Sequence, residues 1–187
     1  MRQPLTLEEL NKVMEEADLL KSEQEVEAAL SSMADAITDR LKDSMPVVYG
    51  IMNGGLVTAG RLLPKLNFPL EQGYMHATRY RGETTGSTDL QWQAPPSIDM
   101  TDRTVLIVDD IFDEGNTLCE VVRSCKQQGA KEVITAVLVN KVHDRKNTDL
   151  CIDIVGMDVE DRYVFGCGMD YRGYWRNAPG IYAVKGL

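Results

Sequence analysis

The residues best suited to chemistry stand together near the middle of the chain. Asp109 and Asp110 are adjacent, Asp113 follows three residues later, and Glu114–Thr117 completes the run. Two adjacent carboxylates repel each other unless a cation or ligand hydroxyl groups compensate their charge. This pair therefore predicts either a cation or a ligand with neighbouring hydroxyl groups at this position.

The residues around these acids predict a phosphate site. Residues 104–108 are apolar and β-branched without alternation, which indicates a strand buried on both faces. A helix is predicted from about Thr117 to Gln128, closed by Gly129. Ligands bind at the carboxyl ends of such strands, and the N–H groups that begin a helix hold anions. Hydroxyl acceptors next to a phosphate cradle fit a ribose 5-phosphate. The alternative is that the acids only cap the helix, which would explain one carboxylate rather than three.

The elements that must position this segment follow from local patterns. Two capping boxes, Thr6 with Glu9 and Ser22 with Glu25, predict two helices at the beginning of the chain. The strand–helix–strand alternation around the acids predicts a right-handed crossover and a parallel sheet. From 81 to 103 the periodicity stops, which indicates either a disordered loop or a lid. Further elements are expected at 47–52 (strand), 56–66 (helix), 74–80 (strand), 133–139 (strand), 151–155, 163–169 and 181–184 (weaker strands).

The composition narrows the class of protein. A chain of 187 residues has the length of a single domain. Its 29 acidic and 20 basic residues give a net charge of −9. Nucleic acids and membrane surfaces are polyanions, so neither is expected as a partner. The four cysteines form no C-x-x-C pair and there are two histidines, which argues against zinc and disulfides. We expect a reducing, cytoplasmic compartment, with neither a signal peptide nor a membrane span.

Residues 105–118 closely resemble the phosphoribosyl-pyrophosphate signature of the type I phosphoribosyltransferases. From about Ser22 to Val184 the chain resembles the bacterial hypoxanthine-guanine branch of that family. The resemblance implies a central parallel sheet flanked by helices, with a core at about 44–160 of a single 1–187 domain. N-terminal and C-terminal segments would form a small hood over a purine site. The implied reaction, in purine salvage, moves a phosphoribosyl group from 5-phospho-α-D-ribose 1-diphosphate to N9 of hypoxanthine or guanine, with Mg²⁺ as cofactor, giving IMP or GMP and pyrophosphate.

The resemblance also implies roles within the acidic segment. Asp109 and Asp110 would bind the ribose hydroxyls and, together with Asp170, the metal ion. Asp113 would be the general base beside N7 of the purine. Glu114 stands where the family usually has Thr or Ser, and we expect its carboxylate to turn away from the phosphate while its N–H still donates. The turn expected to bind the 5-phosphate consists of Glu114, Gly115, Asn116 and Thr117.

Other matching motifs supply the pyrophosphate and purine contacts. Pyrophosphate would be bound by Arg176 and by a loop with Asn53 and Gly54, where the family often has a non-proline cis peptide and a basic residue at the Asn53 position. Lys141 would donate to the 6-oxygen of the purine, which disfavours a 6-aminopurine. Read alone, these residues indicate an ordinary turn, a solvated arginine and a surface lysine. The remaining purine contacts would be Tyr163, by stacking, Val164, through its backbone, and Asp170.

Arg79 and Tyr80 match the start of the family's flexible catalytic loop, which usually reads Ser-Tyr and closes to exclude water. The resemblance further implies small-molecule partners and a homodimer or homotetramer. Two alternatives stay open. One is the same fold with another base, of which Lys141 disfavours adenine but not xanthine. The other is a regulator that senses the phosphoribosyl donor and binds nucleic acid, which the net charge of −9 disfavours.

Overall fold

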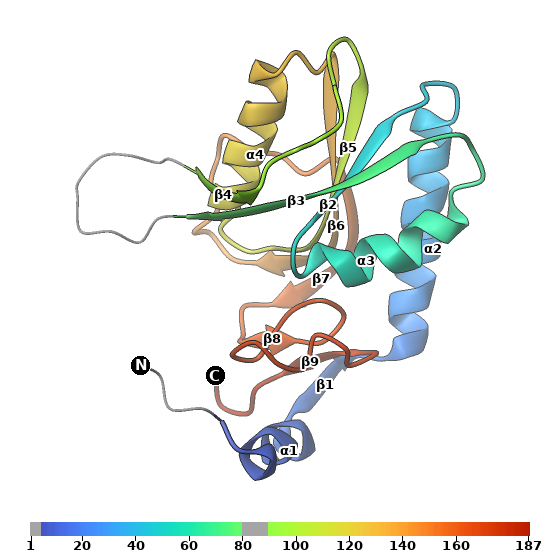
Figure 1. Cartoon of the computed structure of the whole chain (residues 1–187). Coiled ribbons are helices and arrows are strands. Elements are labelled where there is room, and N and C mark those ends of the chain that lie inside the picture. Colours follow the sequence, from blue (N-terminus) through green and yellow to red (C-terminus); the bar gives the residue numbers. More distant parts are fainter. Residues whose placement is uncertain (1–4, 80–89) are drawn as a thin grey trace.

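The computed structural model describes residues 5–79 and 90–187, and its largest element is a six-stranded sheet with the order β4-β3-β2-β5-β6-β7 (Figure 1). Strands β3, β2, β5, β6 and β7 are parallel to one another, and β4 runs antiparallel to β3. The sheet confirms the mainly parallel α/β class predicted from the sequence. Its strands are β2 (Val47–Ile51), β3 (Glu71–Arg79), β4 (Leu90–Ala94), β5 (Thr104–Phe112), β6 (Glu132–Val142) and β7 (Ile154–Glu160).

Helices cover both faces of this sheet. On one face lie α2 (Glu23–Leu41) and α3 (Gly55–Leu62), and on the other lies α4 (Asn116–Gln127). Successive residues of a strand point to opposite faces, so Leu106 packs into the core beneath α2 and α3, and Ile107 packs beneath α4. Burial on both faces explains why the central strands are apolar without alternation.

A second, three-stranded antiparallel sheet joins the two ends of the chain. Its order is β1-β9-β8, with β1 (Asp18–Lys21), β8 (Val164–Phe165) and β9 (Ile181–Ala183). The guanidinium of Arg162 fastens this sheet, because it donates to Asp18 at 2.6 Å and to the Val184 carbonyl at 3.1 Å. We call residues 18–21 and 163–184 the hood, which confirms the small appended unit expected from the sequence.

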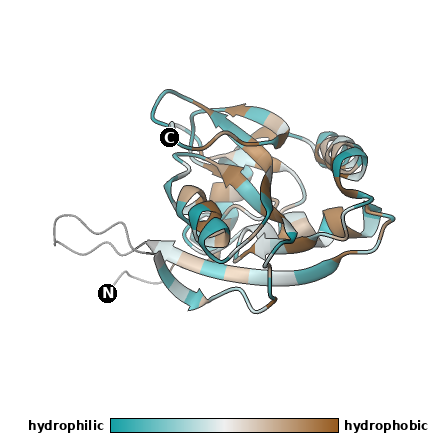
Figure 2. Cartoon of the chain, turned by 90° about the horizontal axis from the view of Figure 1, so that it is seen from above, coloured by the Kyte–Doolittle hydropathy of each residue, from teal (hydrophilic) through white to brown (hydrophobic). Residues whose placement is uncertain are grey.

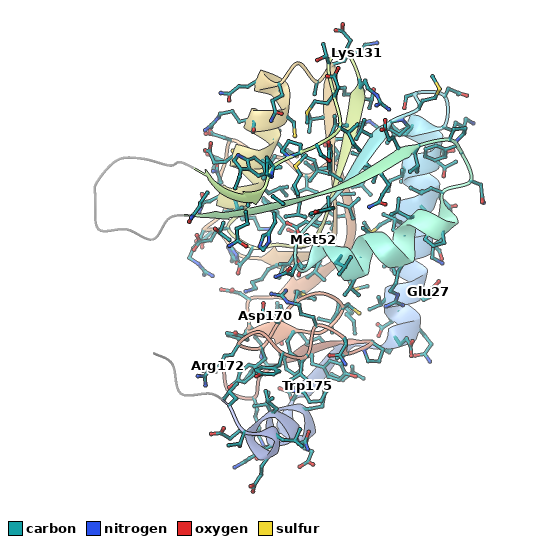
Figure 3. All side chains as sticks on the ribbon, viewed as in Figure 1. Glu27, Met52, Lys131, Asp170, Arg172 and Trp175 are labelled. Carbon is teal, nitrogen blue, oxygen red and sulfur yellow. The ribbon has the colours of Figure 1, made fainter. Side chains whose placement is uncertain are left out.

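The N-terminal helices begin as their capping boxes predict. The Glu9 amide donates to Thr6 Oγ1 at 3.2 Å at the start of α1 (Leu7–Glu16), and the Glu25 amide donates to Ser22 Oγ at 3.3 Å at the start of α2. The indole of Trp175, in the hood, donates to a carbonyl of α1 at 3.0 Å (Figure 3). Helix α1 is thus held against the hood rather than against the large sheet.

Several strands differ from the local patterns. β4 lies within the stretch 81–103 predicted as a loop, of which residues 81–89 are outside the described part. β5 runs to Phe112 and β6 to Val142, several residues beyond the apolar runs. β7 begins at Ile154 rather than Cys151, and β1 has no counterpart among the predicted elements. In each case pairing with a neighbouring strand outweighs the local signal.

Hydropathy follows this layout. The hydrophobic colours gather in the strands at the middle of the molecule, and hydrophilic colours mark the loops and parts of the helices (Figure 2). The four cysteines are free thiols, of which Cys151 is exposed and the other three are buried. Among residues 5–79 and 90–187, no helix combines the length and the apolar character that crossing a bilayer requires.

Candidate active site

A cavity of about 420 Å³ lies between the carboxyl ends of the central strands and the hood. Met52 and Asp170 line it from opposite sides, one after β2 and the other in the hood (Figure 3). An adjoining cavity of about 840 Å³ shares Asp109, Asp110 and Asp113 with the first and continues along the start of α4. Both volumes are typical of small-molecule sites. Most of the sequence-predicted site residues line one or both: Asn53, Gly54, Asp109, Asp110, Asp113, Glu114, Gly115, Asn116, Thr117, Lys141, Tyr163, Val164, Asp170 and Arg176.

The two predicted loop residues, Arg79 and Tyr80, stand at the boundary of the described part of the chain. Arg79 is the last residue of β3, and its neighbours Ala77 and Thr78 line the adjoining cavity. Tyr80 lies outside the described residues.

The acidic pair forms the floor where the two cavities meet. Asp109 and Asp110 belong to the last four residues of β5 rather than to the loop after it. Asp110 is only 7% exposed. Burial, reinforced by the neighbouring Asp110 carboxylate, raises the pKa of Asp109 well above its usual value. Burial also raises the pKa of Asp110. The protein itself leaves the charge of this pair largely uncompensated, which suits a site that receives a cation or hydroxyl donors.

Two glycines allow the chain to close around Asp110. A Cβ atom on Gly54 would lie 1.8 Å from Asp110 Oδ2, and one on Gly168 would lie 2.3 Å from the Gly54 carbonyl oxygen. The turn after β2 and the hood therefore meet directly at the carboxylate. The Met52–Asn53 peptide bond in this turn is cis, as the resemblance implies.

The turn that begins α4 presents main-chain groups, because the acids do not cap the helix. Its N-cap is Gly115, at φ 79°, and no side chain in the described residues caps α4. The Glu114 carboxylate instead accepts a hydrogen bond from the side-chain amide of Asn116 at 3.0 Å. The side-chain amide of Asn147 donates to the Asn116 side-chain oxygen at 3.2 Å, and the Asn147 backbone N–H donates to the Glu114 carbonyl at 2.8 Å. The capping alternative is therefore wrong for Asp109, Asp110 and Asp113.

Asp113 has an environment opposite to that of the acidic pair. Lys141 Nζ donates to its Oδ2 at 2.8 Å, and His143 Nε2 lies 2.7 Å from its Oδ1. Burial raises the pKa of Asp113, but these two hydrogen bonds outweigh burial and bring the pKa below its usual value. Asp113 is thus ionised near neutral pH and able to accept a proton.

Sequence reasoning missed His143 and Asp161. Lys141 and His143 are two residues apart at the end of β6, a spacing that places both on one face of an extended chain, and this signal could have found His143. The Asp161 carboxylate lies 4.0 Å from Lys141 Nζ and pairs with both terminal nitrogens of Arg145, at 2.8 and 3.0 Å. Asp113, His143 and Asp161 bring ligand atoms within 4.8 Å of one another, but Lys141 and Arg145 already neutralise the two acids.

The hood supplies an aromatic ring and a basic group. Tyr163 is 41% exposed and packs edge-on against Tyr171, with ring centroids 5.7 Å apart. Arg176 donates to the Gly168 carbonyl at 2.6 Å and pairs with Asp170 Oδ1 at 2.5 Å. Asp170 Oδ2 accepts from the Gly173 amide at 2.6 Å. Both oxygens of Asp170 are therefore engaged, although each keeps a further lone pair for a ligand.

Comparisons with known proteins agree with this geometry. A family model described as "Phosphoribosyl transferase domain" matches residues 16–172. A hypoxanthine-guanine phosphoribosyltransferase of Bacillus subtilis is 29% identical over 167 residues, covering 89% of this chain and 92% of the relative. A hypoxanthine-guanine-xanthine phosphoribosyltransferase of Tritrichomonas foetus is 28% identical over 168 residues, covering 89% and 91%. The crystal structure of a Staphylococcus aureus hypoxanthine phosphoribosyltransferase superimposes with a TM-score of 0.86 at 23% identity, covering 92% and 94%.

Replacing Gly54 tests the close packing at Asp110. We expect Gly54→Ala to lower the free energy of unfolding by about 1–3 kcal/mol, because the new methyl group displaces the carboxylate or the turn. Gly60→Ala is the matched control, since nothing lies within 4 Å of a Cβ at that helical position. Urea unfolding of both variants checks this, and equal stabilities would contradict it.

Removing one charge of the acidic pair should stabilise the protein at neutral pH. A carboxyl group with a raised pKa in the folded state binds its proton more tightly there, so its ionisation destabilises the fold as pH rises above the unfolded pKa. Asp109→Asn should therefore raise Tm at pH 8, by roughly 2–4 °C per kcal/mol of repulsion removed. The gain should shrink towards pH 4.

Thermal unfolding in chelator, against Asp35→Asn on the exposed face of α2, measures this difference. An Asp109→Asn variant less stable than wild type at pH 8 would refute the uncompensated charge.

Proposed function

Because this chain belongs to the phosphoribosyltransferase family, we propose that it transfers the 5-phosphoribosyl group of 5-phospho-α-D-ribose 1-diphosphate to N9 of hypoxanthine or guanine in purine salvage. One observation carries the proposal. Asp113, ionised and bonded to Lys141 at 2.8 Å, lines the same cavity as the acidic pair. Asp113 as the proton acceptor, Lys141 as the hydrogen-bond donor to O6 of the purine, and the acidic pair as the ribose site would thus share one cavity.

The donor substrate would be bound along the edge from β2 to α4. Asp109 and Asp110 accept hydrogen bonds from the ribose hydroxyls, and the main-chain N–H groups of residues 114–117 bind the 5-phosphate. The free N-terminus of α4 supports this, because its N–H groups have no side-chain cap among the described residues. Asn53, Gly54 and Arg176 bind the pyrophosphate.

The acidic residues fit Mg²⁺. Carboxylate oxygens are the hard ligands that this ion prefers, and burial together with the neighbouring Asp110 carboxylate raises the pKa of Asp109, which a bound cation would offset. Asp109, Asp110 and Asp170 would hold the ion. When bound, it would offset the charge that collects on the leaving pyrophosphate.

The base would lie between β6 and the hood. Lys141 is 9% exposed, so its ammonium group reaches the cavity along a buried stem and donates to O6 of the purine. The exposed face of Tyr163 stacks on the ring, and the Val164 backbone and Asp170 bind the base edge. A 6-aminopurine presents a donor to Lys141 in place of an acceptor, so adenine is rejected.

In the transfer step the C1′–O bond to pyrophosphate breaks and its electron pair leaves with the pyrophosphate. The N9 lone pair forms the new C1′–N9 bond, and the proton on N7 passes to the Asp113 carboxylate. Proton transfer to a positioned base is worth roughly 10²–10⁴ in rate. Enclosure between the sheet and the hood limits competing hydrolysis of the ribosyl group.

An absorbance assay tests the reaction. With the diphosphate donor and Mg²⁺, we expect IMP from hypoxanthine and GMP from guanine, and no product after chelation of the metal. The two relatives above differ in whether xanthine is named as a base. Competition among hypoxanthine, guanine, xanthine and adenine therefore decides between the hypoxanthine-guanine proposal and its xanthine alternative. No turnover with any of the four would overturn the proposal and favour the donor-sensing regulator.

Asp113→Asn should reduce turnover by roughly 10²–10⁴-fold, because the amide accepts no proton, and should leave donor binding largely intact. Stopped-flow turnover and calorimetric titration with the donor measure the two effects separately. Unchanged turnover in the purified variant would remove Asp113 from the mechanism.

We further propose that the protein acts on small molecules without nucleic acid or membrane, in a reducing cytoplasmic compartment. The net charge of −9 and the four free thiols support these expectations. A homodimer or homotetramer remains the proposed assembly, which light scattering would measure.

A further inference from the structure

His143 lies behind Asp113 and away from the proposed substrates. Its side chain is 3% exposed, whereas that of Asp113 is 43% exposed. The imidazole lines a separate cavity of about 380 Å³, together with Phe112 and Lys146, and is absent from the lining of the two cavities at the acidic pair. His143 therefore contacts Asp113 from the buried side, opposite the cavities proposed to hold the substrates.

The hydrogen bonds of the ring define its tautomer. The Arg145 backbone N–H donates to His143 Nδ1 at 3.1 Å, so Nδ1 carries a lone pair. In the neutral ring the hydrogen then lies on Nε2, which donates to Asp113 Oδ1 at 2.7 Å. The contact thus has a definite direction, from the histidine to the carboxylate.

The loop that carries the histidine is itself fastened. Arg145 forms two hydrogen bonds with Asp161, at 2.8 and 3.0 Å. Asn147 donates through its backbone N–H to the Glu114 carbonyl at 2.8 Å. The loop that carries the ring is therefore held by Asp161, just after β7, and by Glu114, in the turn before α4.

Lys141, the other partner of Asp113, also lies near a second carboxylate, that of Asp161. It lies 4.0 Å from Asp161 and, under the proposed function, donates to the purine when the base is bound. The Arg145 N–H keeps Nδ1 of His143 engaged, so Nε2 has Asp113 as its acceptor whether or not the base is present. His143 is thus the contact to Oδ1, and Oδ2, which Lys141 would release on donating to the purine, is the oxygen that would meet the base.

We propose that His143 is a positioning residue for the general base: it fixes Asp113 Oδ1 and directs Oδ2 towards N7 of the purine. This inference rests on the proposed function. It has the form of a catalytic group oriented by a buried third group. Loss of the outer partner of a metal ligand costs about 10- to 100-fold in activity, and we expect a loss of the same order for this outer partner of a general base.

The charged groups that face this contact are Lys141 from β6, Asp161 from the loop after β7, and Arg145 and Lys146 from the loop of His143 itself. All four remain in a variant of His143. Removing the Nε2 donor then leaves Lys141 as the single side-chain donor to Asp113 among the described residues, and the pKa of Asp113 should rise. The acidic limb of the rate profile should shift to higher pH.

The experiment compares His143→Leu with His143→Gln, whose amide nitrogen restores a donor near the place of Nε2. We expect Leu to lower the single-turnover rate about 10- to 100-fold with little change in KM for the base, and to shift the acidic limb upwards. Gln should recover most of the rate and the wild-type limb. Asp144→Asn, at the exposed next position of the loop, is the control and should match wild type.

Two measurements keep the test independent of turnover and of loss of stability. Nitrogen NMR of the ring should show a hydrogen on Nε2 and none on Nδ1, and carbon NMR titration should show a raised Asp113 pKa in the Leu variant alone. An Nδ1–H tautomer, or equal rates and equal Asp113 titration in the Leu and Gln variants, would overturn the positioning role. If wild type turns over no purine, the proposed function fails, and the NMR arms still decide whether His143 orients Asp113.

Discussion

The repulsion between two carboxylates at the end of β5 is the constraint around which this protein is built. Asp109 and Asp110 are held where burial raises the pKa of both, and the glycines at 54 and 168 bring main chain from two sides against Asp110. No fold needs such a pair for stability, since burying like charges is costly. The surrounding sheet and hood hold the pair in place, which suits a site that receives a ligand or a cation.

The same edge holds a third carboxylate in the opposite electrostatic state. Asp113 is only three residues beyond Asp110, yet Lys141 and His143 bring its pKa below the usual value. Neighbouring groups whose environments move their pKa values apart are suited to different tasks. The acidic pair suits binding, and Asp113 suits proton transfer. Strand pairing creates this division, because Phe112 of β5 lies opposite Asn140 of β6 and so brings Asp113 near Lys141.

One departure from the family pattern, Glu114, lies in a segment that hydrogen bonds to Asn116 and Asn147 support. Glu114, at a position the family usually fills with Thr or Ser, is joined to Asn116, and Asn147 is joined to both residues. The loop of residues 143–147 thus contacts Asp113, the proposed general base, through His143, and the proposed phosphate turn through Asn147. One short segment after β6 thereby coordinates two parts of the proposed site.

The sequence by itself determined the local features: both capping boxes, the buried strands, the helix after the acids and the acidic segment. These depend on hydrogen bonds and periodicity within a few residues, so their patterns are readable. Only the tertiary structure decided that β4 forms in a stretch without periodicity, that His143 reaches Asp113 across 30 positions, and that Gly168 meets Gly54. Such contacts depend on the register between distant strands and on backbone approach, which no local pattern of side chains encodes.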